Sequence, residues 1–216
     1  MEKRVHSSKL HYNDSIMEKL IKNLITRRFD AHFCATKEEA VALALSMVHE
    51  GAVVGYGGSV TLNETGMLEA LRKAPCKLLD RDRASTPEER ERCLLQGPNA
   101  DVFFASVNAI DESGVIYQTE GRGSRVAPIM FGAKKVVLLV GKNKIVKDKE
   151  AAEKRLREIA CPRNAARLNR KTPCRETGVC MDCIALECIC ANRVEMRLSA
   201  VPNRIAVLLI DEELGY

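Results

Sequence analysis

The chain has 216 residues, a hydrophobic content of 46% and a formal net charge of +5 at pH 7. This length and composition suit one packed domain, and no apolar run approaches the roughly 18 residues that a membrane-spanning helix needs, so we expect no membrane insertion. The N-terminal stretch has no apolar signal core, and basic residues are not interleaved with aromatic ones. Both features favour a cytoplasmic protein that binds no nucleic acid.

Helical and extended segments alternate along most of the chain. After residues 1–12, which we expect to be a flexible N-terminus, capping signals and apolar spacing predict helices over about 14–28, 36–51, 62–71, 86–97, 124–131 and 148–159. Apolar and β-branched runs predict strands at 30–35, 52–54, 77–79, 101–107, 115–117, 135–140 and 205–210, with a hairpin-like turn at 111–114. The pattern predicts a single α/β domain, residues 1–216, with a mainly parallel sheet in Rossmann-like layers.

The loop GYGGS, between a short strand and a helix, is the first candidate site. Gly57 and Gly58 would let backbone N–H groups approach an anion at the helix start, and Ser59 and Thr61 add hydroxyl donors. Glu64 is the one carboxylate nearby in sequence and is the candidate catalytic residue. The plain alternative is a strand-to-helix connection that needs glycine only for its geometry.

Three further loops carry polar residues at strand exits or at an expected helix start. In an open α/β sheet, ligands bind outside the carboxyl ends of the strands, so we expect these loops to converge with the first one. Their candidate ligand-binding residues are Asn108, Gly121, Gly123, Arg125, Asn143 and Lys144. Guanidinium and ammonium groups suit phosphate or carboxylate, although a Lys-rich loop is often only a solvated surface.

The segments GGSVTLNETG, EGRGSRVAPIMFGAKKVVLLVGKNKIVKD and RIAVLLIDEELG resemble the LUD (lactate-utilisation) family, which includes LutC and YkgG type proteins. The likeness spans about Asn13 to Gly215. It implies a sheet of the NagB/RpiA/CoA-transferase-like type, in which phosphorylated sugars, CoA esters or folates bind at glycine loops. It also implies a role in oxidation of lactate or a related small acid. Some enzymes of that superfamily use a glutamate as nucleophile or base, but no motif maps Glu64 onto that residue.

The C-terminal part carries a cysteine-rich insertion at residues 172–192. Its thiols are candidate ligands for Zn²⁺ or an iron–sulfur cluster, and they are Cys174, Cys180, Cys183, Cys188 and Cys190. Two alternatives stay open: a redox dithiol at Cys180 and Cys183, or a strand in which Cys188 and Cys190 face the core. The remaining cysteines are isolated in sequence, and for them burial as small hydrophobes is expected.

The functional expectation is a protein of organic-acid utilisation that binds an anionic small molecule, a phosphate, CoA ester or carboxylate, at the strand-exit loops. The alternative is an electron-transfer or assembly subunit that carries a metal or cluster and docks onto oxidoreductase partner subunits. The fold class also predicts a homodimer.

Overall fold

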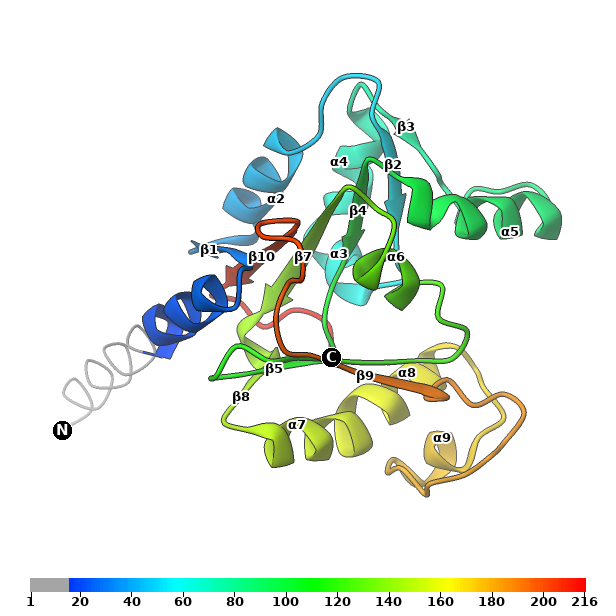
Figure 1. Ribbon diagram of the computed structural model, residues 1–216. Coiled ribbons are helices and arrows are strands. Elements are labelled where there is room, and N and C mark those ends of the chain that lie inside the picture. The colour runs from blue at the N-terminus through cyan, green and yellow to red at the C-terminus, as the bar shows by residue number, and fades with distance from the viewer. Residues whose placement is uncertain (1–15) are drawn as a thin grey trace, which may run out of the picture.

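The computed structural model describes residues 16–216, so the expected flexible N-terminus at residues 1–12 lies outside the described part. A six-stranded sheet with the order β1-β10-β7-β4-β2-β3 forms the centre (Figure 1). Its strands are β1 (Asp30–Cys34), β2 (Val53–Tyr56), β3 (Lys77–Leu78), β4 (Val102–Ala105), β7 (Lys135–Gly141) and β10 (Ile205–Ile210). Every neighbouring pair is parallel, so the predicted α/β class with a parallel sheet is confirmed.

The two strands that read as continuous apolar runs lie side by side in the middle of this sheet. All six residues of β10 are buried, as are six of the seven residues of β7. Both faces of the sheet are covered, which is why these strands show no polar alternation. The helix over residues 16–26 packs on one face through Leu20 and Leu24, whereas α2, α3 and α4 cover the other face.

The predicted helices are present with changed ends, and α9 was not predicted. Their bounds are α2 (Lys37–Ser46), α3 (Val60–Glu64), α4 (Met67–Lys73), α5 (Pro87–Gln96), α6 (Val126–Met130), α7 (Lys149–Arg155), α8 (Cys161–Arg167) and α9 (Pro173–Thr177). Single turns at η1 (Gly97–Asn99) and η2 (Lys142–Lys144) are 3₁₀-helical, and η3 (Leu156–Ala160) is a π-helical turn that joins α7 to α8. The helix predicted to end near residue 159 therefore continues through η3 to Arg167.

Two other helices also differ from the prediction. Thr36 caps α2 by accepting from the Glu39 N–H at 3.2 Å, and the Glu39 carboxylate accepts from Ala35 N, but the helix ends at Ser46 rather than at the predicted residue 51. The predicted helix over 62–71 is two helices, α3 and α4, because Gly66 between them adopts φ +76°, a left-handed conformation that interrupts helical hydrogen bonding.

A second sheet, below the first in Figure 1, has the order β8-β5-β6-β9. Its strands are β5 (Ala109–Asp111), β6 (Ile116–Glu120), β8 (Ile145–Val146) and β9 (Asn192–Met196). The β5–β6 pair is antiparallel, which confirms the hairpin. The strand β9, which was not predicted, follows the cysteine segment and pairs antiparallel with β6. Among the described residues, no helix combines the length and apolar character needed to cross a membrane.

Candidate functional site

A cavity of about 600 Å³ lies where β2, β4 and β7 end. Ser59 follows β2, Ser106 and Asn108 follow β4, and Lys144 follows β7; all four line this cavity. The carboxyl ends of parallel strands share one edge of a sheet, so loops far apart in sequence meet there. The cavity is therefore at the place where this architecture holds ligands, and its volume is in the range of small-molecule sites.

Seven of the predicted ligand-binding residues line the cavity, namely Gly58, Ser59, Thr61, Asn108, Gly121, Arg125 and Lys144. The other three do not. Gly57 lies directly behind the wall, since a Cβ there would be 2.5 Å from Arg125 Cγ. Gly123 has φ +87° and allows the turn into α6, with open space around its Cα. Asn143 belongs to a different contact, as described below.

Lys144 is the most deeply buried charged group of the cavity, with 3% of its surface exposed. Its Nζ donates to Thr61 Oγ1 at 2.7 Å and to Ser106 Oγ at 2.9 Å. Within residues 16–216 no carboxylate forms an ion pair with it. Burial, assisted by the nearby Arg155 and Arg125 guanidinium groups and opposed by Glu64, lowers the pKa of Lys144 to about 7. A buried ammonium with only neutral partners is a site that an anion would stabilise.

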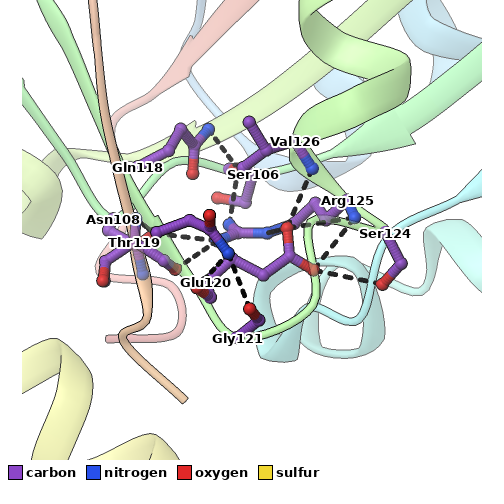
Figure 2. Close-up of polar contacts among 10 residues, drawn as sticks. Ser106, Asn108, Gln118, Thr119, Glu120, Gly121, Ser124, Arg125 and Val126 are labelled. Atoms are coloured by element: carbon purple, nitrogen blue, oxygen red, sulfur yellow. Dashed lines mark hydrogen bonds and ion pairs between the residues drawn. The ribbon is translucent and has the colours of Figure 1, made fainter. Parts of the chain in front are cut away.

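Arg125 forms the adjoining wall, and Figure 2 shows how its contacts hold it. Its Nη2 donates to Asn108 Oδ1 and to the Thr119 carbonyl, both at 2.9 Å, and Nη1 donates to the Ser106 carbonyl at 3.3 Å. The Glu120 carboxylate lies 3.9 Å from Arg125 Nε. Burial lowers the pKa of the Arg125 guanidinium. These contacts fix the side chain, so that it does not need to be ordered when a ligand binds.

The Glu120 carboxylate organises the turn before α6. It accepts from the backbone N–H groups of Arg125 and Val126 at 2.8 to 3.0 Å and from Ser124 Oγ at 3.2 Å (Figure 2). The two backbone donors lie at the start of α6, where N–H groups have no intrahelical partner, and Ser124 precedes the helix. Glu120 is thus the structural carboxylate of this wall.

Arg81 approaches the cavity from the loop after β3. Its guanidinium carbon lies 5.3 Å from the centre of the Tyr56 ring, and a Cβ at Gly58 would be 2.5 Å from Arg81 Nη2. The buried Nε has no hydrogen-bond partner in the described part of the chain, since Asp82 is 3.7 Å away. A buried donor without an acceptor costs free energy, so this nitrogen also favours an incoming oxygen atom.

The cavity lining as a whole is strongly cationic. Seven basic residues stand against three acidic ones, a formal excess of four positive charges, and they are Arg81, Arg90, Arg122, Arg125, Lys144, Arg167 and Arg170 against Glu91, Glu120 and Glu187. Some of these side chains form ion pairs within the lining, for example Arg122 with Glu91 at 2.6 Å, but the three acidic residues are too few to neutralise the seven basic ones. Since the whole sequence carries a net charge of only +5, the positive potential is concentrated at this cavity.

Two predicted residues instead bind the C-terminal tail. The Glu64 carboxylate accepts from Gly215 N at 2.6 Å, and Asn143 contacts both the Gly215 carbonyl and Leu214 N at 3.0 Å. Neither side chain lines the cavity. A catalytic role for Glu64 has no support in this arrangement, because its carboxylate is engaged in holding the tail.

The cysteine segment forms another wall of the cavity through Leu186, Glu187, Cys188 and Ile189. Within the described residues, no three Cys, His, Asp or Glu side chains come close enough together to hold a metal ion. The thiols have other contacts: Cys174 lies 3.4 Å from the Thr172 hydroxyl, and Cys188 lies 3.2 Å from Cys190. The thiols in this arrangement do not fit a zinc or iron–sulfur site, and metal binding stays a prediction.

Three of the residues that shape the cavity and were not predicted from the sequence are Ser106, Glu120 and Arg81. Ser106 and Glu120 are direct neighbours of singled-out segments, since Ser106 precedes Val107 and Asn108, and Glu120 precedes Gly121. Their positions at strand ends could have marked them as candidate site residues. Arg81 lies in a charged stretch without a motif, and nothing in the sequence indicates that it meets Gly58.

The chain is similar to known proteins in both sequence and structure. A family model described as the LUD domain matches residues 17–210, which agrees with the resemblance in the sequence. A DUF162 family protein from Deinococcus radiodurans has a similar structure, with a TM-score of 0.53 and 11% identity over 91% of this chain and 97% of that chain.

Weaker likenesses include eIF2B delta from Chaetomium thermophilum, with a TM-score of 0.36 and 19% identity over 69% of this chain and 57% of that one. Ribose 5-phosphate isomerase A from Methanocaldococcus jannaschii has a TM-score of 0.33 and 18% identity over 52% of this chain and 55% of that one. Such likenesses carry no information on activity. Curated proteins gave no match. The family match covers most of the sequence, so the chain belongs to the LUD-domain family and is a protein of the lactate-utilisation type.

Proposed function

We propose that the cavity binds an anionic small molecule during the utilisation of lactate or a related organic acid. The candidate ligands are a phosphate, a CoA ester or a carboxylate, which share an anionic oxygen group. The observation that carries the proposal is Lys144, a buried ammonium on two hydroxyl groups and without an ion-pair partner among residues 16–216.

The energetic argument concerns the cost of burying charge. An ammonium removed from water without a counterion destabilises the fold by several kcal/mol, an order-of-magnitude figure, and a bound anion would offset part of that cost. Arg81 Nε, a buried donor without an acceptor in the described part of the chain, supports the same conclusion from a second side chain. The cationic lining adds long-range attraction that would speed the encounter with an anion.

The test measures binding and stability together. Inorganic phosphate, acetyl-CoA and pyruvate are titrated calorimetrically against the chain, and each is also added in a thermal-unfolding assay. A ligand present at 100 times its Kd should stabilise the fold by about 2.7 kcal/mol. At least one of these anions should bind the wild-type chain and raise its melting temperature.

Lys144→Met tests the site, and Lys134→Met is the matched control. Lys134 is an exposed lysine paired with Asp101 and does not line the cavity. The control should bind the anion as the wild type does, whereas Lys144→Met should bind it at least about tenfold more weakly, as expected for loss of one charged contact. Absence of binding by all three anions, or equal binding by both variants, would contradict the proposal.

A further inference from the structure

The cysteine segment contributes Cys188 to the cavity wall, and the thiol of Cys190 lies next to that of Cys188. Cys188 lines the cavity and Cys190 does not. The backbone at 188–189 packs against the turn after β6, since a Cβ at Gly121 would be 3.4 Å from both the Cys188 carbonyl oxygen and Ile189 Cα. The position of Cys188 is therefore set by the loop that also carries Glu120 and Arg125.

The two sulfur atoms are already close to each other. Cys188 Sγ lies 3.2 Å from Cys190 Sγ, and it accepts a hydrogen bond from the Cys190 N–H at 3.4 Å. Both thiols are free and half-buried. A disulfide has a sulfur–sulfur bond of about 2.05 Å, so bond formation needs the two sulfur atoms to approach by about 1 Å more.

We propose that Cys188 and Cys190 form a redox dithiol that reduces an anionic disulfide bound in the cavity. The pair differs from the Cys180 and Cys183 pair that the CxxC spacing suggests. It adds an oxidation–reduction activity to anion binding, and it assigns the cysteine segment a chemical role that needs no metal.

The order of attack follows from which of the two cysteines lines the cavity. The Cys188 thiolate attacks one sulfur of the disulfide R–S–S–R, which gives a Cys188–S–S–R mixed disulfide and releases the first thiolate, RS⁻. Burial raises the pKa of Cys190 to about 12, so its proton passes to the first RS⁻ as Cys190 attacks the Cys188 sulfur, which forms the Cys188–Cys190 disulfide and releases the second RS⁻. Both RS⁻ ions take up protons, so two electrons pass from the protein dithiol to the small disulfide.

The preference for an anionic disulfide rests on the same cationic lining as the proposed function. Arg170 and Arg122 line the same cavity as Cys188, and so do the buried Lys144 and Arg125. A negatively charged disulfide would be concentrated there, and a positively charged one would be repelled. The proposal can therefore be tested by comparing the reaction rates of disulfides of opposite charge.

The test uses oxidised glutathione, which is doubly anionic at pH 7, and cystamine, which is doubly cationic. The full-length chain is first treated with a chelator, its metal content is measured, and the reaction with each disulfide is followed by intact mass and peptide mapping. Oxidised glutathione should produce a Cys188–Cys190 disulfide, seen as the loss of two hydrogens. It should react at least about tenfold faster than cystamine at low salt, and the ratio should shrink as salt screens the lining.

Serine variants separate the two roles. Cys190→Ser should stop at a glutathione adduct on Cys188, and Cys188→Ser should form neither the adduct nor the disulfide. Cys93→Ser is the control, since Cys93 is half-buried on α5 and does not line the cavity; it should react like the wild type.

The proposal is overturned if oxidation joins other cysteines, if Cys188→Ser reacts like the wild type, or if cystamine matches oxidised glutathione. Zinc or iron that is held by these thiols and protects them from oxidation would also overturn it. A chain that binds no anion in calorimetry but forms the Cys188–Cys190 disulfide refutes the proposed function alone. A chain that binds anions without this reaction refutes the dithiol alone.

Discussion

Lys144→Met should change the pH dependence of stability, because it removes a lysine whose pKa folding lowers. The pKa falls from an ordinary value of 10.5 to about 7, so between these pH values the unfolded chain binds more protons than the folded chain. Stability then rises with pH in this interval. Between pH 6 and pH 9 the wild type should gain about 3 kcal/mol relative to Lys144→Met, since one pKa unit corresponds to about 1.4 kcal/mol.

The assay is urea unfolding of both chains at several pH values and constant ionic strength. Only the difference between the chains is interpreted, because buried thiols such as Cys34 and Cys161, whose pKa burial raises to about 11, act in the opposite direction near pH 9. Lys142→Met is the matched control for loss of a lysine from the same turn, since Lys142 is a more exposed residue paired with Asp211 at 3.0 Å. A difference that stays constant from pH 6 to pH 9 would refute the burial of an unpaired ammonium.

Three further predictions concern the same cavity. Sulfate keeps its charge between pH 6 and pH 9, so its calorimetric affinity should fall up to about tenfold per pH unit above pH 7 as Lys144 loses its proton; an affinity independent of pH would exclude Lys144 from the site. Glu120→Gln should lower the free energy of unfolding by roughly 3 kcal/mol, because it removes a half-buried carboxylate that accepts several hydrogen bonds. Glu91→Gln, at an exposed ion pair, should change urea unfolding little, and equal effects of the two would contradict this role. Gly58→Ala should displace the Arg81 guanidinium and weaken sulfate binding by about tenfold while urea unfolding stays close to wild type, and unchanged binding would show that Arg81 is not a ligand contact.

The arrangement of the main sheet could be predicted from the sequence because its strands are marked locally. KVVLLV and IAVLLI are continuous apolar runs, and only strands covered on both faces tolerate them, so β7 and β10 were predicted near their observed positions. The second sheet has no such signal. The strand β9 is short and mostly exposed, and it is a strand because its backbone pairs with β6, which is a tertiary contact.

The same distinction applies to the cavity. Ser59, Asn108, Arg125 and Lys144 could be selected in advance, because each follows or adjoins a strand exit and the exits of parallel strands meet. Glu64 and Asn143 meet the same criteria, yet the structure uses them for the tail. The sequence does not show which polar side chains will form hydrogen bonds with the backbone of residues 214–215 and so be unavailable to a ligand. Arg81 was missed for the converse reason, since its position depends on Gly58 leaving room for it.

The contacts of the C-terminal tail, residues 214–215, also explain why the Lys144 ammonium is shielded from solvent. A Cβ at Gly215, where φ is +61°, would lie 2.6 Å from Thr61 Oγ1 and 3.3 Å from Lys144 Nζ, so the tail backbone packs directly against the two groups. Thr61 Oγ1 also lies 3.3 Å from the Leu214 carbonyl, which it contacts as a donor. Glu64 and Asn143 hold this tail in place, and thereby exclude water from the ammonium. Glu64 and Asn143, which the sequence predicted as catalytic and ligand-binding residues, thus act on the site indirectly. They limit the hydration of the Lys144 ammonium, which increases the stabilisation that a bound anion would provide.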